Sequence, residues 1–170
     1  MPNKVLIVGD THTSSFESLP KKMLQLIREA DWVIHVGDYT SIDVLSGFIK
    51  KKGPRFRGVY GNADPLQIRK KLLEKDIIEI SNKKIGITHP ASGGSSRNTK
   101  RKVQVEFKND NLDAIIYGHT HESNIEIFDG ILLVNPGKGY LEKSFFGPPT
   151  SVAILTIGKR ITGNIELIQF

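Results

Sequence analysis

Five short apolar runs, rich in Val and Ile, recur along this chain and constrain its fold more than any other feature. They are VLIV (5–8), WVIHV (32–36), RGVY (57–60), KIGIT (84–88) and AIIY (114–117). Runs of this kind are typical of β-strands that are buried on both faces. Helical spacing of apolar residues between the runs predicts helices over 16–28, 44–49, 68–73 and 103–107. The alternation predicts βαβ units and a largely parallel sheet, an α/β fold class.

The pattern changes after residue 124, where strand-like segments follow one another directly. NIEIFDGILLVNPG (124–137) reads as two strands around the turn Asp129-Gly130, and the segment 151–170 reads as a second hairpin. The sequence contains no linker and no repeat. We therefore expect a single domain over residues 1–170, with an antiparallel C-terminal third.

Polar side chains that can bind a metal follow the buried strands, one to four residues beyond each strand end. Since the carboxyl ends of parallel strands face one crevice, we expect these side chains to converge in space. The converging set is Asp10, His12, Asp38, Asn62, His89, His119 and His121.

The chemistry of this set points to a metal centre. The chain contains no cysteine, so any metal must be held by oxygen and imidazole ligands, which suit Mn, Fe, Zn or Ni. Seven ligands are too many for one ion but fit two ions that share a bridging carboxylate. Two ions about 3.5–4 Å apart can clamp a phosphoryl group and supply hydroxide near neutral pH.

Single members of the set also have ordinary structural explanations. Asp38 could cap the following helix, and Asn62 with Asp64 could form a turn. These explanations weaken because four of the five histidines lie at ends of buried strands. The fifth, His35, lies inside WVIHV among apolar neighbours, and we expect it to be a hydrogen-bonded core residue.

The motifs around these residues resemble a known family. They are D-x-H (10–12), G-D (37–38), G-N-x-D (61–64), T-H (88–89) and G-H-T-H (118–121). Their order and spacing resemble the calcineurin-like metallophosphoesterases, in particular the small single-domain prokaryotic phosphodiesterases. NPGK (135–138) and GPPTSVAIL (147–155) resemble the C-terminal segment of these enzymes, so the likeness extends over nearly the whole chain.

The resemblance implies a four-layer α/β/β/α sandwich and hydrolysis of a phosphodiester by a hydroxide that bridges two divalent metals. It divides the ligands into a first set, a second set and a bridge: Asp10, His12 and His121; Asn62, His89 and His119; and Asp38. It also places Asp38, Asn62 and Asp64 at the reaction centre, where we expect Asp64 to orient its neighbours. The metals implied are Mn, Ni, Fe or Zn, with Mn favoured.

Two positions depart from the family pattern. Many members have a histidine after the asparagine, where it assists the leaving group, whereas this chain has Ala63. The general acid therefore remains unassigned. Pro90 follows His89 directly, and the loop GGSSR (93–97) beside the expected site either contacts substrate phosphate or is a plain loop.

Charge and composition limit which partners and which cellular location can be expected. A formal charge of +6 fits a phosphate-rich partner as well as ordinary solvated surface. No segment resembles a signal peptide or a membrane span, and we expect a cytoplasmic protein that acts on a small phosphodiester. Three further hypotheses stay open: a non-catalytic scaffold similar to the retromer subunit of eukaryotes, a nuclease or other nucleic-acid-binding protein, and a homo-oligomer that uses Phe145-Phe146.

Overall fold

The computed structural model describes residues 1–90, 96–141 and 147–168, and these residues form two five-stranded β-sheets. The first sheet contains β1 (Asn3–Val8), β2 (Trp32–His35), β3 (Phe56–Gly58), β9 (Ser151–Ile157) and β10 (Ile161–Leu167), in the order β10-β9-β1-β2-β3. The second contains β4 (Lys75–Ile80), β5 (Lys83–Thr88), β6 (Ala114–Tyr117), β7 (Asn124–Phe128) and β8 (Ile131–Asn135), in the order β4-β5-β6-β8-β7.

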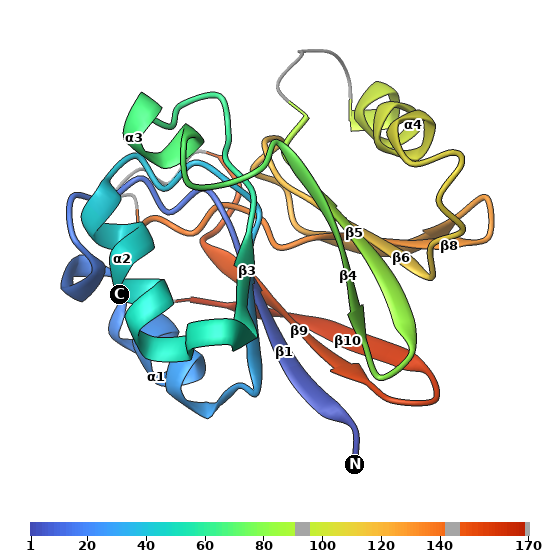
Figure 1. The fold of residues 1–170 in the computed structure, drawn as a ribbon, viewed down its shortest axis with the longest axis horizontal. Helices are drawn as coiled ribbons and strands as arrows, with labels where there is room; N and C mark the ends of the chain where they lie inside the picture. Colours follow the sequence, from blue (N-terminus) through green and yellow to red (C-terminus); the bar gives the residue numbers. More distant parts are fainter. Residues whose placement is uncertain (91–95, 142–146, 169–170) are drawn as a thin grey trace.

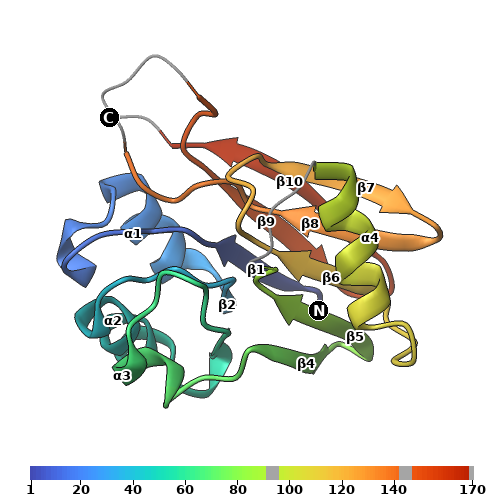
Figure 2. The ribbon, with the colours of Figure 1, turned by 90° about the horizontal axis from the view of Figure 1, so that it is seen from above.

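Helices cover the outer face of each sheet. The first sheet is covered by α1 (Lys21–Glu29), α2 (Ile42–Lys52) and α3 (Leu66–Arg69), while α4 (Ser96–Glu106) covers the second (Figures 1 and 2). Two short 3-10 turns, η1 (Phe16–Ser18) and η2 (Gly53–Arg55), precede α1 and follow α2. The result is the expected four-layer α/β/β/α sandwich.

Three apolar clusters hold the four layers together. The first lies between the first sheet and helices α1 and α2, and Met23, Leu45 and Phe48 are fully buried in it. The second lies between the two sheets, where Ile7 and Ile87 are fully buried. The third joins α4 to the second sheet and is built around Val103, Phe107, Ile115, Tyr117 and Leu133. Burial of these faces explains why the strands read as continuous apolar runs.

The largely parallel sheet that the alternation of strands and helices predicted was wrong, because the parallel strands are divided between two mixed sheets. Strands β1, β2 and β3 are parallel in one sheet, and β5, β6 and β8 are parallel in the other. Both predicted hairpins, β7–β8 and β9–β10, are confirmed. The sequence reading missed β4, an edge strand whose Lys, Asp and Glu residues conceal the alternation of buried Ile78 and Ile80.

The helix boundaries differ from the predicted ones for local reasons. The segment 16–28 is divided because Pro20 sits at the N-cap of α1, and a proline inside a helix would remove a hydrogen bond. Helix α3 ends at Arg69, well before Leu73, which bridges to Val59 instead. Helix α4 begins at residue 96, earlier than the predicted 103. No helix among the described residues is long and apolar enough to cross a membrane.

Candidate metal centre

The seven predicted ligands converge where strands of both sheets end. Asp10 and His12 follow β1, Asp38 follows β2, and the remaining members follow β3, β5 and β6: Asn62, His89, His119 and His121. Backbone hydrogen bonds join the first two loops, since Asp10 N donates to Gly37 O (2.9 Å) and His12 N donates to Asp38 O (3.3 Å). The loops after β1, β2 and β3 belong to the first sheet and those after β5 and β6 to the second, so both sheets supply ligands.

The backbone at these positions is unusual. Five of the seven residues have a positive φ, between 39° and 86°: Asp10, His12, Asp38, His119 and His121. Residues other than glycine seldom adopt this left-handed conformation, and each instance costs on the order of 1–3 kcal/mol. Strain of this kind concentrates at functional sites because the fold must hold the side chains in one arrangement.

The first ligand group consists of Asp10, His12 and His121, whose ligand atoms all lie within 4.8 Å of one another. Asp10 Oδ1 is 3.3 Å from His121 Nε2 and 3.8 Å from His12 Nε2. This oxygen is buried and accepts no hydrogen bond from the described residues. A buried carboxylate oxygen between two imidazoles is costly without a partner, and a cation would supply one.

The second group consists of Asp38, His89 and His119, also within 4.8 Å of one another. His89 Nδ1 donates to the carbonyl of Val36 (2.7 Å), which turns Nε2 toward the centre. Asn62 Oδ1 lies 3.0 Å from His89 Nε2 and 3.1 Å from His119 Nδ1. The amide oxygen of Asn62 thus lies beside the two imidazoles of this group.

Asp38 lies between the two groups. Its Oδ2 is 3.5 Å from His12 Nε2 in the first group and 3.3 Å from His89 Nε2 in the second. Its Oδ1 accepts a hydrogen bond from Ala63 N (2.8 Å), and a side chain at Gly61 would overlap this oxygen. The Asp38 carboxylate is therefore fixed between the two ligand groups.

The ionisation of these side chains suits a cation. Burial would raise the pKa of Asp38, but the rings of His12 and His89 hold it well below its usual range. Burial would also raise the pKa of Asp10, but His12 and His121 lower it below its usual value. The carboxylates of Asp10 and Asp38 in turn raise the pKa of His12 to about 9. A bound cation would take the place of this proton, and the donor set of carboxylate, amide and imidazole fits borderline divalent ions.

Asp64 acts on the loops that carry the ligands. It is buried, and its carboxylate accepts hydrogen bonds from three backbone amides: Asp38 (2.9 Å), Thr40 (2.8 Å) and Gly61 (2.8 Å). Burial raises the pKa of Asp64, and the three amides act in the opposite direction. The orienting role expected for Asp64 thus has a structural basis, because its acceptor oxygens bind the loops after β2 and β3.

His35 is fully buried and contacts the loops that follow β1 and β2. Its Nδ1 accepts a hydrogen bond from Gly37 N (3.1 Å), so Nε2 carries the proton and donates to Thr11 Oγ1 (3.0 Å). Its ring stacks on Tyr39 with centroids 3.6 Å apart. Burial lowers the pKa of His35 to about 3, so the ring is neutral. The predicted hydrogen-bonded core residue is found.

Two residues near the centre escaped the sequence reading. Thr11 lies between two ligands and binds His35, and Tyr140 places its ring 5.3 Å from that of His12 and 5.8 Å from that of His121. The only available signal was position: Thr11 lies inside the D-x-H motif, and Tyr140 follows NPGK closely. Residues 93–95 of the GGSSR loop and Phe145-Phe146 lie outside the described residues.

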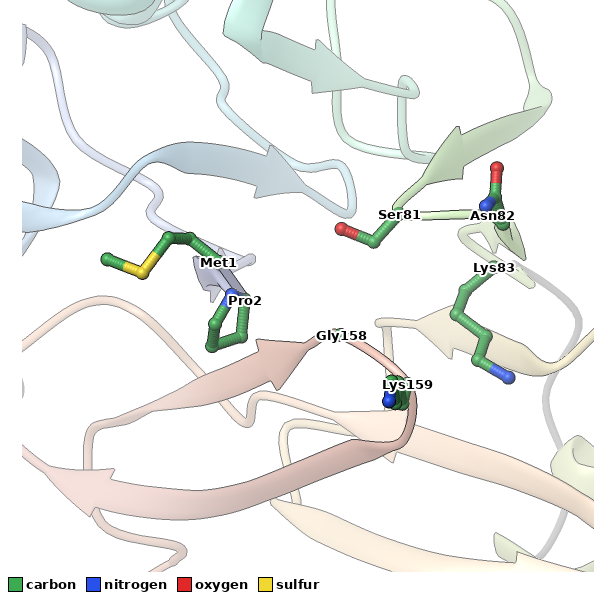
Figure 3. A pocket seen from close by; sticks show the side chains of 7 residues that line it. All are labelled: Met1, Pro2, Ser81, Asn82, Lys83, Gly158 and Lys159. Carbon is green, nitrogen blue, oxygen red and sulfur yellow. The ribbon is translucent and has the colours of Figure 1, made fainter.

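Cavities of the molecule do not all relate to this centre. A cavity of about 680 Å³ lies at the opposite end of the strands, between the N-terminus and the β4–β5 and β9–β10 turns (Figure 3). Its described lining includes Ser81, Asn82, Lys83 and Lys159 but no carboxylate or imidazole. Since metal chemistry needs such ligands, we assign the candidate site to the converging groups and not to this cavity.

Comparisons with known proteins find a matching family and relatives over nearly the whole chain. Residues 4–160 match the calcineurin-like phosphoesterase superfamily domain, a family that uses divalent metals. Two proteins of Methanocaldococcus jannaschii are similar over 96% of this chain. One is named a probable metallophosphoesterase (34% identity, 80% of its length), and the other a phosphodiesterase (32% identity, 99% of its length).

A solved structure shares the fold. Vps29 from Entamoeba histolytica, solved in complex with Zn²⁺, has a TM-score of 0.70 and 21% identity over 98% of this chain and 99% of that chain. The matching domain, the curated relatives and the shared fold lead to one conclusion: the chain belongs to the calcineurin-like phosphoesterase superfamily.

Proposed function

We propose that this protein is a metal-dependent phosphodiesterase in which two divalent ions share Asp38. The observation that carries the proposal is the position of Asp38 Oδ2, which lies 3.5 Å from His12 Nε2 and 3.3 Å from His89 Nε2. One carboxylate oxygen thus faces an imidazole from each ligand group. Asp10 Oδ1 is buried and accepts no hydrogen bond from the described residues, so a cation held by the first group would be its partner.

Two divalent ions, when bound, supply hydroxide near neutral pH and offset the charge that develops on the phosphoryl oxygens. The residues of this chain are already in the ionisation states and orientations that metal ligands need. The carboxylates of Asp10 and Asp38 stay ionised, and Val36 O holds the proton of His89 on Nδ1, so Nε2 keeps its lone pair for a ligand role. Asn62 adds a neutral oxygen to the second group.

Neither residue 63 nor residue 64 is suited to protonate the leaving group. Ala63 is exposed and presents a methyl group where many family members have imidazole. Asp64 does not replace it, because both of its oxygens accept backbone N–H groups. We infer that the enzyme depends on the acidity of the leaving group, with aryl esters hydrolysed faster than alkyl esters.

The preference for diesters rests on a relative that is similar over nearly the whole chain. The M. jannaschii protein named a phosphodiesterase is 32% identical over 96% of this chain. We propose Mn²⁺ as the working metal among the ions that such a ligand set accepts, which include Ni, Fe and Zn. A cytoplasmic location and a small phosphodiester substrate belong to the same proposal.

The competing function is a non-catalytic scaffold. A protein named for vacuolar protein sorting, rather than for hydrolysis, shares the fold and was solved with zinc. Metal binding alone therefore does not distinguish an enzyme from a scaffold. The complete ligand set favours catalysis, since each of the seven positions carries a side chain that can bind a metal.

Turnover is the test. Metal-depleted protein is loaded with Mn²⁺, Zn²⁺ or Ni²⁺ and assayed on bis(4-nitrophenyl) phosphate, 4-nitrophenyl phosphate, a cyclic nucleotide and single-stranded DNA. We expect metal-dependent hydrolysis of the aryl diester, faster than that of the monoester. Protein that binds two ions but hydrolyses none of these esters would support the scaffold, and preferential cleavage of DNA would support a nuclease.

A further inference from the structure

A small cavity opens beside the first ligand group. It has a volume of about 160 Å³ and lies between the loop after β1, the turn η1 and the segment that follows β8. His12 is both a member of the ligand group and part of the cavity wall. A phosphoryl group held by the two ligand groups would therefore have this cavity next to one of its substituents.

The wall formed by Tyr140 is held from several sides. Its ring contacts the rings of His12 and His121, and the ammonium of Lys138 lies 5.0 Å from its centroid. Its carbonyl accepts a hydrogen bond from Thr150 Oγ1. The preceding residue, Gly139, donates its N–H to Asp10 O (3.1 Å). The cavity is thus preformed and connected to a metal ligand.

The lining has two kinds of surface. Leu19, Pro20 and the ring of Tyr140 provide apolar area, and Thr13 and Ser18 provide hydroxyl groups. The Thr13 hydroxyl has no hydrogen-bond partner among the described residues, whereas Ser18 Oγ is 2.7 Å from Ser15 Oγ. No Asp, Glu, Lys or Arg is among the described residues that line the cavity. Such a surface suits an uncharged group that has an apolar face and hydroxyls.

The volume limits the group to about one ring. An engineered protein cavity of about 150 Å³ accepts one benzene molecule, and pockets for drug-sized ligands measure about 300–1,000 Å³. At about 160 Å³, this cavity accommodates a furanose or a ring of similar size. A whole nucleoside would leave its base outside.

We propose that this cavity is the subsite for one ester substituent of the substrate, which is an uncharged, hydroxyl-bearing group one ring in size, and that Tyr140 and Thr13 determine this specificity. The inference rests on the proposed phosphodiesterase function and narrows its substrate class. It also gives a reason for diester preference, since a monoester whose single substituent leaves from the other side would leave the subsite empty.

The test uses three diesters with the same 4-nitrophenyl leaving group. Their second substituents are methyl, phenyl and 5-ribosyl, and kcat/KM is measured with Mn²⁺-loaded protein. We expect kcat/KM for the ribosyl ester to exceed that for the methyl ester by about tenfold or more, with the value for the phenyl ester between them. Because the leaving group is constant, the ratios report the second substituent alone.

Substitutions at two positions separate the contribution of the Tyr140 ring from that of the Thr13 hydroxyl. Tyr140→Leu should bring the ribosyl-to-methyl ratio close to one, and Tyr140→Phe should keep it because the aromatic face remains. Val is similar in shape to Thr but lacks the hydroxyl, so Thr13→Val should lower kcat/KM for the ribosyl ester several-fold relative to that for the phenyl ester. Lys159→Ala, in the remote cavity of Figure 3, is the matched control and should leave all three ratios unchanged.

The outcomes distinguish the two proposals. If metal-loaded protein hydrolyses none of the three diesters, the phosphodiesterase function is refuted, and this inference with it. If all three are hydrolysed at equal kcat/KM, or if Tyr140→Leu and Thr13→Val both keep the wild-type ratios, the subsite alone is refuted. Metal content measured on each variant shows whether a lost ratio comes from a lost ion instead, and a ratio lost only through such ion loss also counts against the subsite.

Discussion

Replacing Asp64 with Asn separates an orienting role from an acid role. Asp64 Oδ2 accepts from the amides of Asp38 and Gly61, and Oδ1 accepts from Thr40 N, at 2.8–2.9 Å. Asn has one acceptor oxygen, so its NH₂ group must face at least one backbone N–H. The variant loses the charge assistance of three bonds, each worth about 1.5–3 kcal/mol, and keeps at most two neutral bonds worth about 1 kcal/mol each.

We expect the free energy of unfolding of Asp64→Asn to fall by about 3 kcal/mol after allowing for relaxation of the loops. For a chain of this size the melting temperature should fall by about 6–12 °C. The metal affinity of both ligand groups should fall together, because the loops that carry Asp38 and Asn62 lose the hydrogen bonds that Asp64 makes to them. Asp129→Asn, in the exposed β7–β8 turn, is the matched control and should change stability by less than about 0.5 kcal/mol.

The assay is thermal unfolding of metal-free protein, followed by calorimetric titration with Mn²⁺. An Asp64→Asn variant that melts and binds metal like the wild type, but loses activity on alkyl esters alone, would identify Asp64 as the proton donor. The orienting role would then be wrong, and the hydrogen bonds to the three amides would be incidental to the chemistry.

Three further predictions concern single side chains. The pKa of His35 is about 3, below the ordinary 6.5, so the unfolded chain binds the extra proton between these values, and stability should fall as pH falls from about 6.5 toward 3. Denaturant unfolding should show a pH slope up to about 1.4 kcal/mol per unit smaller in His35→Gln than in the wild type, and equal slopes would contradict the buried neutral ring. Ala63→His should accelerate alkyl esters more than aryl esters in kcat/KM, and equal acceleration across a leaving-group series would show that the missing imidazole does not limit the rate. His121→Ala should retain one ion near Asp38, His89 and His119 in metal analysis, and loss of both ions would show that the two groups depend on each other.

The strand-end residues were predictable because a parallel strand always delivers its next residues to the same edge of its sheet. Asp10 and Asp38 follow β1 and β2 in the same way that His89 and His119 follow β5 and β6. The sequence pattern did not show that these pairs belong to different sheets, since both sets of strands are buried and read alike. The family resemblance implied two sheets, and the pairing of β1 with β9 and of β4 with β5 shows how the strands divide between them.

The supporting contacts were beyond sequence reasoning. Asp64 binds the amides of residues 24 and 26 positions away, and such backbone donors exist at every residue and leave no mark in the sequence. Tyr140 owes its place to the contact between Gly139 and Asp10, which are distant in the chain. Strand β4 was missed because an edge strand with one solvated face carries charged residues.

The shared role of Asp38 can be tested most directly by anomalous scattering from crystals soaked in Mn²⁺. We expect two anomalous peaks, one among Asp10, His12 and His121 and one among Asn62, His89 and His119, with Asp38 Oδ2 bound to both ions. In Asp38→Ala both peaks should weaken together. A single peak in the wild type, or two peaks that persist unchanged in Asp38→Ala, would contradict a centre in which two ions share this carboxylate.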